Sequence, residues 1–210
     1  MMKYYFLEVM GDLDDGALLI LDENPAGIGV KYCFLMHGTE LGNDFPENAV
    51  IPMSGDREGT KLSHLIGNTS SFLIVHQDMR KVIETELNEK AEYFPFTILD
   101  HNGLEYSKDY CIINPLGARD CLDYKRSDID YYKGNKDKVI GVNRYVIETT
   151  KLVDEPALFR IKENPTEYVI SEDLYMKFQE EGFTNVVVRE IEVSDKINMK
   201  MEKRGQNNCF

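Results

Sequence analysis

The first part of the chain alternates short apolar runs with turn-forming residues. Apolar runs of strand length lie at Tyr4–Val9, Ala17–Leu21 and Val30–Met36, and Asp, Asn, Pro and Gly separate them. Such runs between turn formers are typical of β-strands. Residues 38–60 are rich in Gly, Asn, Asp and Pro, which predicts a long loop.

The pattern changes to a helical period after residue 72. Residues 72–75 read as a strand, and residues 76–91 then place apolar side chains at helical spacing with charged side chains on the other face. Asn102-Gly103 follows between two apolar-rich runs. That dipeptide predicts a β-hairpin with a type I′ turn, in which Leu99 faces Tyr106.

A second amphipathic helix is expected near the C-terminus. Ser171 suits an N-cap, Glu172 and Asp173 complement the dipole of the first turn, and Gly182 is a natural stop. Strands are expected on both sides of this helix, at Arg144–Thr150, Ala157–Ile161, Glu167–Ile170 and residues 185–193.

Two segments share an order of strand, polar cap, amphipathic helix and strand. They are residues 73–99 and 168–191, related by a shift of 95 positions. We expect an α+β fold with a mixed, largely antiparallel sheet and two main amphipathic helices in this repeated strand–helix–strand unit. We expect residues 1–70 to form acidic strands and a long loop, and residues 71–210 to form the α+β region. The two parts would make one compact domain or two closely packed halves.

Charge restricts the partners of the chain. Asp and Glu number 37 against 24 Lys and Arg, a net charge of −13, and residues 1–60 hold eleven of the acids but only three bases. Phosphate backbones and anionic lipids would repel such a chain, so nucleic acid and membrane surfaces are poor partners. A basic protein would be attracted, although acidity also serves solubility alone.

Targeting and redox signals are absent from the sequence. No apolar run approaches the roughly 20 residues needed to cross a bilayer, and the N-terminus reads as a first strand rather than a signal peptide. The four cysteines, Cys33, Cys111, Cys121 and Cys209, form no C-x-x-C pair. We therefore expect free thiols and a cytoplasmic location.

Motifs for catalysis and for cofactor binding fail on inspection. Residues 27–32 have two glycines of a dinucleotide fingerprint but Tyr32 where the third small residue belongs. Residues 12–16 resemble a calcium loop whose glycine comes too early. Asp128 and Asp130 are better read as a solvated loop or helix start, and no histidine pair has metal-ligand spacing. We predict no catalytic residue, no metal and no cofactor.

The stretch "DYCIINPLGARDCLDYKRS" at 109–127 resembles a small active site but reads as architecture. Residues 114–117, Asn-Pro-Leu-Gly, match a type I turn that would join strands at Tyr110–Ile113 and Ala118–Leu122. Alternation places Tyr110 and Ile112 on one face of the first strand, with Cys111 and Ile113 on the other. The polar residues of 123–127 would pin the exit of the second strand.

The same stretch carries a family resemblance. Residues 93–130 and 157–193 resemble an immunity-protein family of bacterial polymorphic toxin systems, the eleventh in its numbered series and formerly a domain of unknown function. The resemblance covers roughly residues 70–192, and His76 stands where the family often has Ser. The matching positions, expected to be structural, are Tyr110, Asn114, Pro115, Asp120, Leu122, Asp123, Ser127, Phe159 and Arg160.

The resemblance implies a cytoplasmic protein that binds and blocks a cognate toxin domain without catalysis. Because many toxin domains that attack nucleic acids are basic, the acidic N-terminal region is the expected interface. Its candidate residues are Asp12, Asp14, Asp15, Asp22 and Glu23. The main alternative is an enzyme or small-ligand domain with a Cys/His/Asp site assembled in space, and a deep pocket holding a His or Cys of perturbed pKa would favour it.

Overall fold

The computed structural model describes residues 2–133, 135–152 and 154–194, which form an α+β structure. A five-stranded sheet has the order β10-β13-β1-β12-β11, antiparallel except for the β10–β13 pair. Its strands are β1 (Tyr4–Leu7), β10 (Val146–Glu148), β11 (Leu158–Ile161), β12 (Asn164–Ser171) and β13 (Val188–Ser194).

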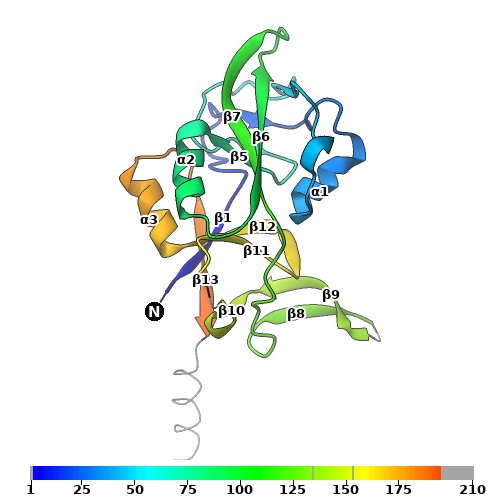
Figure 1. Ribbon diagram of the computed structural model, residues 1–210, viewed down its shortest axis with the longest axis vertical. Coiled ribbons are helices and arrows are strands. Elements are labelled where there is room, and N and C mark those ends of the chain that lie inside the picture. The colour runs from blue at the N-terminus through cyan, green and yellow to red at the C-terminus, as the bar shows by residue number, and fades with distance from the viewer. Residues whose placement is uncertain (1, 134, 153, 195–210) are drawn as a thin grey trace, which may run out of the picture.

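A four-stranded sheet lies above the five-stranded one in Figure 1, in the order β3-β6-β7-β5. Only β3 and β6 run parallel. Its strands are β3 (Val50–Pro52), β5 (Leu73–His76), β6 (Ala91–Leu99) and β7 (Glu105–Pro115). Two ribbons complete the strands: β2 (Ile20–Leu21) with β4 (Gly67–Asn68), and β8 (Asp128–Tyr132) with β9 (Asn135–Arg144).

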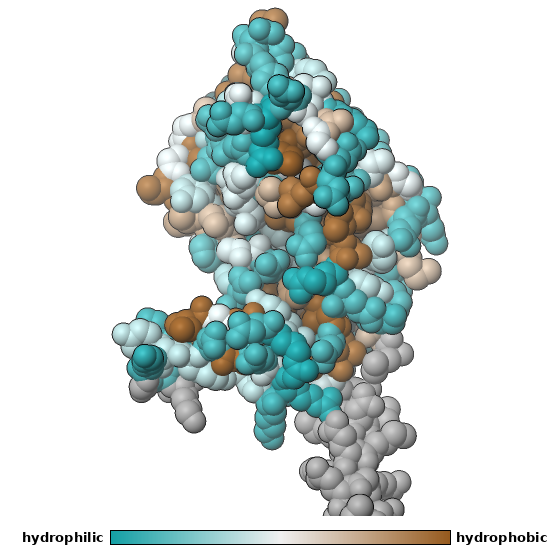
Figure 2. Space-filling view, turned by 180° about the vertical axis from the view of Figure 1, so that it is seen from behind, coloured by the Kyte–Doolittle hydropathy of each residue, from teal (hydrophilic) through white to brown (hydrophobic). Residues whose placement is uncertain are grey.

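Three α-helices lie on the two sides of the sheets. α2 (Gln77–Glu86) and α3 (Glu172–Glu180) pack together on one side, and α1 (Tyr32–His37) lies on the other (Figure 1). Short 3₁₀ turns, η1 (Gly29–Lys31), η2 (Gly42–Asp44) and η3 (Thr149–Lys151), occur in the connections. On the reverse face, hydrophilic residues surround smaller apolar areas along the middle of the molecule (Figure 2).

The core consists of three apolar clusters on opposite sheet faces. β7 sends Tyr110 and Ile112 into a cluster shared with the N-terminal segments, while Cys111 and Ile113 enter a second cluster beneath α2 and α3. This alternation agrees with the sequence prediction. The third cluster lies on the far face of the five-stranded sheet and contains Phe159.

The helices connect strands that flank a central strand. α2 joins β5 to β6 on either side of β7, and α3 joins β12 to β13 on either side of β1. His76 and Ser171 cap these helices, accepting from the backbone N–H of Asp78 and Leu174. Gly182 follows α3 with φ +68°, as expected of a helix stop. Whether the two units are a true repeat stays a prediction.

One predicted N-terminal strand is wrong. Val30–Met36 is helical, formed by η1 and α1, and it ends at Gly38, whose φ is +66°. The reason is the spacing of its contacts: Leu35 is buried, and Tyr32 and Met36 pack partly against the same cluster. Positions three and four apart share a helix face, whereas a strand would have separated them.

Two predicted turns also differ from the structure. The hairpin turn has a positive φ only at Gly103, and the Asp100 carbonyl accepts from the Gly103 N–H. This three-residue loop pairs Leu99 with Glu105 instead of Tyr106. Asn114-Pro115 does not turn but continues β7, because Leu116 N–H donates to the Lys90 carbonyl and Gly117 N–H to the Gly38 carbonyl.

Two loop predictions need smaller corrections. Asp128 and Asp130 lie in strand β8, not in a loop or helix start. The long loop expected at 38–60 contains the 3₁₀ turn η2 and the strand β3. β3 forms backbone hydrogen bonds with β6 as its parallel partner. The helix expected over 76–91 is shorter, since Ala91 already begins β6.

The packing of the N-terminal segments is testable at a glycine. A Cβ on Gly59 would lie 2.2 Å from the carbonyl oxygen of Leu18, whereas a Cβ on Gly16 would meet nothing within 4 Å. We expect Gly59→Ala to lower the free energy of unfolding by about 2 kcal/mol, and Gly16→Ala to leave it within about 0.5 kcal/mol. Urea denaturation checks both, and equal stabilities of the two variants would contradict this packing.

Candidate functional site

The five acidic residues expected to bind a partner lie in two turns near the N-terminus. Asp12, Asp14 and Glu23 are exposed, whereas Asp15 and Asp22 are partly covered. Asp15 pairs with Lys61 at 3.0 Å, and Asp22 pairs with Arg57 at 3.2 Å. The hydrogen bond from Lys61 lowers the pKa of Asp15. Cations of the chain itself thus partly neutralise two of the five positions.

The Asp12 turn is tied to the segment that follows α3. Asp12 donates its backbone N–H to Oδ1 of Asn185 at 2.6 Å, and the Asn185 amide donates to the Leu65 carbonyl at 2.8 Å. Gly11 allows this approach, since a Cβ there would lie 2.3 Å from the Asn185 side chain. The Asp12 turn therefore lies beside the end of α3.

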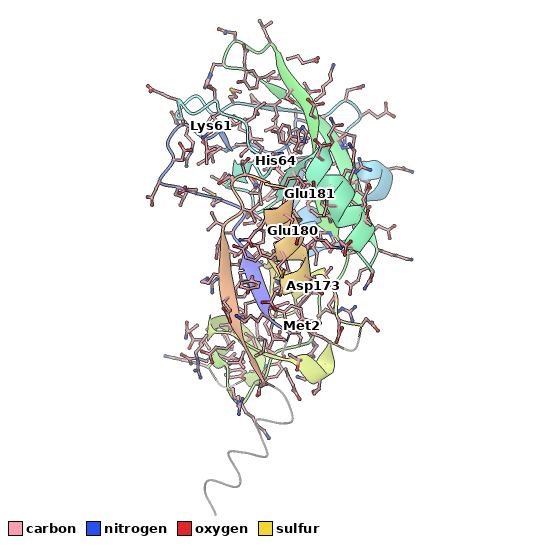
Figure 3. The ribbon with its side chains drawn as sticks, turned by 90° about the vertical axis from the view of Figure 1, so that its left-hand side faces the viewer. Met2, Lys61, His64, Asp173, Glu180 and Glu181 are labelled. Atoms are coloured by element: carbon pink, nitrogen blue, oxygen red, sulfur yellow. The ribbon has the colours of Figure 1, made fainter. Side chains whose placement is uncertain are left out.

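α3 extends the acidic surface beyond the predicted residues. Asp173, Glu180 and Glu181 are exposed and follow one another along the helix (Figure 3). Within residues 2–133, 135–152 and 154–194, these three carboxylates have no ion-pair partner; Lys177 between them pairs with Glu86. Sequence reasoning missed this surface because it assigned Asp173 to the helix dipole and looked for acidity only in the first 60 residues.

Arg160, a family-motif position, is buried with a relative exposure of 1%. Its guanidinium donates to the carbonyls of Leu35 (2.7 Å) and Met36 (3.0 Å) in α1, and to the Pro115 carbonyl (3.3 Å) at the end of β7. It also donates to the Tyr168 hydroxyl at 2.8 Å. One side chain of β11 thereby joins α1, β7 and β12.

No carboxylate contacts Arg160 directly in the described part of the chain. The two helical carbonyls belong to the C-terminal half of α1, where the helix dipole favours a cation. The guanidinium also donates to Oδ1 of Asn114 at 3.4 Å, and the Asn114 amide N–H donates to the Glu92 carboxylate at 2.9 Å. Dipoles and neutral acceptors therefore solvate this buried charge.

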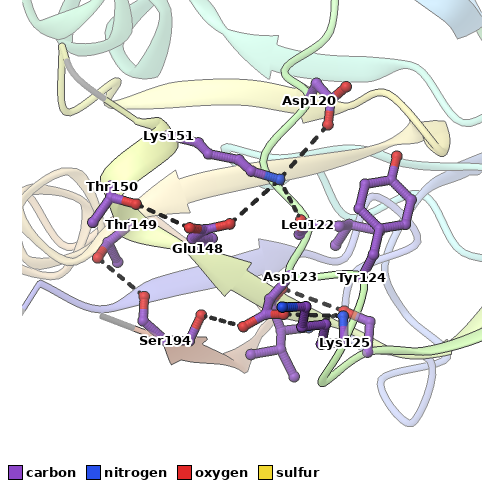
Figure 4. Close-up of polar contacts among 12 residues, drawn as sticks. Asp120, Leu122, Asp123, Tyr124, Lys125, Glu148, Thr149, Thr150, Lys151 and Ser194 are labelled. Atoms are coloured by element: carbon purple, nitrogen blue, oxygen red, sulfur yellow. Dashed lines mark hydrogen bonds and ion pairs between the residues drawn. The ribbon is translucent and has the colours of Figure 1, made fainter. Parts of the chain in front are cut away.

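A second polar network surrounds Asp123, which is also buried (Figure 4). Its carboxylate accepts from the Ser194 hydroxyl at 2.8 Å and from the backbone N–H groups of Lys125 (3.0 Å) and Arg126 (3.3 Å). Burial alone would raise the pKa of Asp123, but these hydrogen bonds outweigh it and hold the pKa below its usual range. Ser127 completes the turn by donating its N–H to the Asp123 carbonyl at 2.8 Å.

The other family-motif positions lie in different parts of the fold and make structural contacts there. Leu122 is buried and its carbonyl accepts from Lys151 at 2.8 Å (Figure 4). Exposed Asp120 pairs with Lys162 at 2.9 Å. Phe159 packs edge-on against Tyr4. Tyr110 donates its hydroxyl to the Ser63 carbonyl at 2.9 Å.

A polar pocket of about 260 Å³ lies where β5 and β7 meet the loop after α3. Residues lining it include His64, His76, Asp109 and Tyr110. Burial, then the neighbouring His76, lowers the pKa of His64. A perturbed histidine in a pocket is part of what the ligand-binding alternative required, but this pocket is smaller than the roughly 300–1,000 Å³ of typical small-molecule sites. Sequence reasoning missed it because residues 64 and 76 meet only when the segment around Leu65 pairs with β5.

The described cysteines stand apart from that pocket. Burial raises the pKa of Cys111 to about 11 and that of Cys121 to about 12, so both stay thiols at neutral pH. Cys33 is partly buried on α1, and Cys209 lies outside the described residues. Among the described residues, His37 approaches Cys33 one turn earlier on α1, but its Nδ1 contacts the Cys33 backbone carbonyl at 2.7 Å rather than the thiol.

Neither a metal-binding cluster nor a membrane-spanning helix is present among the described residues. No group of three or more His, Cys, Asp or Glu side chains is placed to hold a metal ion. None of the helices there is long and apolar enough to span a membrane.

Residues 3–193 match the model of a family described as "Immunity protein family (Imm11)". The chain belongs to the Imm11 family. The match begins far ahead of the roughly 70–192 expected from the sequence, so the N-terminal strands and the Asp12 turn are part of the Imm11 region. A search of curated proteins finds no match. Membership in Imm11 suggests an immunity function, a toxin partner in general and a non-enzymatic role.

Replacement of Arg160 tests the network that joins α1, β7 and β12. Arg160→Met leaves several buried carbonyls without a donor, so we expect a loss of about 3 kcal/mol or more in the free energy of unfolding. Arg160→Lys should recover only part of it, because an ammonium cannot span the same acceptors. Urea denaturation measures both. The matched control is Arg80→Met, which removes a surface pair with Glu84 and a cation–π contact with Tyr93 and should cost only about 1 kcal/mol.

The pKa of Asp123 predicts a pH-dependent contribution to stability. Because its folded pKa is depressed, the stabilisation is present above the unfolded value of about 3.9 and is lost as pH falls through the folded pKa. Asp123→Asn should lower the free energy of unfolding by about 1–3 kcal/mol at neutral pH, and the deficit should shrink towards about pH 3.

Urea titrations of wild type, Asp123→Asn and the exposed control Asp128→Asn across this range provide the measurement. A deficit of the same size at both ends of the range would show that Asp123 does not act through its charge.

Proposed function

We propose that this protein is an immunity protein that binds a cognate bacterial toxin effector domain in the cytoplasm and neutralises it by protein–protein interaction alone. The observation that carries the proposal is the Imm11 match over residues 3–193. Neutralisation by binding needs a complementary surface and no reacting group, and it agrees with the polymorphic toxin systems to which the sequence resemblance points.

The proposed partner is basic. A chain with a net charge of −13 attracts a cationic domain over long range and accelerates its association, most strongly at low ionic strength. A toxin that attacks nucleic acid needs a basic surface to hold its substrate. An acidic inhibitor placed over that surface would block substrate access and be favoured by the same charges.

We place the toxin contact on the acidic N-terminal turns, at Asp12, Asp14, Asp15, Asp22 and Glu23, and extend it onto α3. Asp12 and Asp14 contribute most, because Asp15 and Asp22 already pair with Lys61 and Arg57. The bond between Asp12 and Asn185 supports a continuous surface from this turn to the exposed carboxylates of α3.

The function is tested by capture and rescue. The tagged chain is incubated at low salt with lysate of its native cell, and proteins released by a salt gradient are identified by mass spectrometry. Each candidate is then expressed alone and together with this chain. We expect one basic protein that arrests growth alone and is harmless in co-expression. A toxin that binds stoichiometrically but stays toxic would refute neutralisation by binding.

Charge reversal tests the placement of the interface. The double variant Asp12→Lys/Asp14→Lys should slow association with the toxin about tenfold at low salt, and the loss should shrink as salt screens the field. The matched control reverses Asp128 and Asp130 on the β8–β9 ribbon, with the same change in net charge. Stopped-flow association rates across a salt series measure both. Equal slowing by the two double variants would mean that net charge alone steers the toxin.

A further inference from the structure

The pocket beside His64 is built from four segments that are distant in sequence. His64 comes from the loop before β4, His76 ends β5, Ser107, Asp109 and Tyr110 belong to β7, and Thr184 follows α3. Figure 3 shows His64 on the same side of the molecule as the α3 carboxylates Glu180 and Glu181. The pocket therefore opens next to the acidic surface described above.

A β-bulge aims the β7 residues into this pocket. Between Phe96 and Ile98 the partner on β7 changes from Tyr110 to Ser107, so β7 contains one extra residue. Asp109 bonds its backbone N–H to the Ser107 hydroxyl at 3.2 Å, which holds the bulge. Bulges re-aim side chains and recur beside functional sites. Here the bulge allows Ser107, Asp109 and Tyr110 to line one cavity.

Backbone N–H groups fix both histidine rings. Thr184 donates its N–H to Nδ1 of His64 at 3.1 Å, and Asp78 donates its N–H to Nδ1 of His76 at 3.3 Å. The rings lie edge to face at 5.7 Å, and His76 makes a similar contact with Tyr110 at 5.4 Å. The result is an aromatic wall of fixed rings, and the lowered pKa of His64 keeps that ring uncharged at neutral pH.

The charges around the wall are negative. Within the described part of the chain, the Asp109 carboxylate has one hydrogen-bond donor, the Gln77 amide at 3.4 Å. No Lys or Arg is among the residues that line the cavity. Asp78 stands in the first turn of α2, where its carboxylate offsets the positive end of that helix. Lys81 bonds to Asp78 from outside the lining and lowers its pKa, so the carboxylate stays ionised.

We propose that this pocket receives one guanidinium or ammonium side chain of the toxin, held between the His64–His76–Tyr110 wall and the Asp109 carboxylate. Aromatic faces together with a carboxylate bind organic cations, and the cavity has room for a single side-chain head group. The inference rests on the proposed function. It adds one defined contact, between a cationic side chain of the toxin and this pocket, to the long-range attraction of a basic partner.

The proposal predicts a pH dependence. Acidification protonates His64 and places a positive charge in the wall, so cation binding should weaken as pH falls through the lowered pKa of His64. The titratable groups that face His64 and His76 are the carboxylates of Asp78 and Asp109 and the hydroxyl of Tyr110. Burial raises the pKa of Tyr110 to about 12. Tyr110 thus stays neutral throughout, and protonation of imidazole is the relevant change.

The pocket can be tested without the toxin, with capped arginine (Nα-acetyl-arginine amide) as the probe. Histidine Cε1–H signals are followed by NMR and assigned with single His→Gln variants. Capped arginine should shift the His64 and His76 signals with millimolar affinity and leave those of His37 and His101 unchanged. Its neutral isostere, capped citrulline, should bind about fivefold more weakly or not at all, because it lacks the charge.

Variants and pH define the contact further. Asp109→Asn should weaken capped arginine about fivefold, while the exposed control Asp128→Asn should not. Affinity should also fall between about pH 7.5 and pH 5.5. The proposal is overturned if capped arginine leaves the His64 and His76 signals unmoved, or if citrulline binds equally well. Thermal unfolding of each variant checks that the fold is intact.

A toxin arm separates this inference from the proposed function. With the toxin in hand, Asp109→Asn should lower its affinity about tenfold relative to Asp128→Asn. If wild type neutralises the toxin and Asp109→Asn does so with equal affinity, the pocket contact is wrong and the immunity function stands. If wild type neutralises no toxin, the proposed function fails, and the capped-arginine titration still decides whether the pocket binds cations.

Discussion

The buried guanidinium of Arg160 is the contact on which the arrangement of the two sheets depends. It reaches from β11 to the carbonyls of α1 and to the end of β7, and it contacts the Tyr168 hydroxyl of β12. Tyr168 in turn donates to the Ser71 carbonyl and accepts from the Leu73 N–H at the start of β5. Segments of both sheets therefore share one polar chain, and unsatisfied buried groups would make any other arrangement costly.

Asp123 has the corresponding role at the opposite end of the five-stranded sheet. Its carboxylate closes a turn and binds Ser194 at the end of β13, while Thr149 donates its hydroxyl to the Ser194 carbonyl. Both networks use residues of the family signature, and both are buried. Their chemistry is that of a framework, because the guanidinium of Arg160 and the carboxylate of Asp123 are both engaged by groups of the chain itself.

The outward-facing features have a different character. Asp12, Asp14 and the α3 carboxylates project from elements that the framework holds in place, and the His64 pocket opens beside them. This separation of buried, satisfied polar groups from exposed, unneutralised acids suits a protein whose task is to present a surface. In the proposed complex, an acidic residue is expected to contribute to recognition only where no internal Lys or Arg offsets its charge.

Local chemistry in the sequence determined the α+β class, the capped helix at Ser171, its stop at Gly182 and the two-faced strand at Tyr110–Ile113. Those features follow from caps, glycine and alternation, which act over a few residues. The tertiary structure alone decided that Val30–Met36 is a helix, since packing of Leu35 and the cap at Gly38 override its strand-like composition.

Contacts between residues distant in sequence decided the path of the chain at Asn114-Pro115, the pairing of the N-terminal acids and the position of His64. Asn114-Pro115 continues a strand because Lys90 and Gly38, which are distant in sequence, accept the backbone N–H groups that follow it. Lys61 and Arg57 partly offset the charges of Asp15 and Asp22. His64 meets His76 because the segment around Leu65 pairs with β5, where the His76 N–H donates to the His64 carbonyl. Composition predicted the acidity, but its distribution over the surface depends on which cations and backbone groups the fold brings within reach.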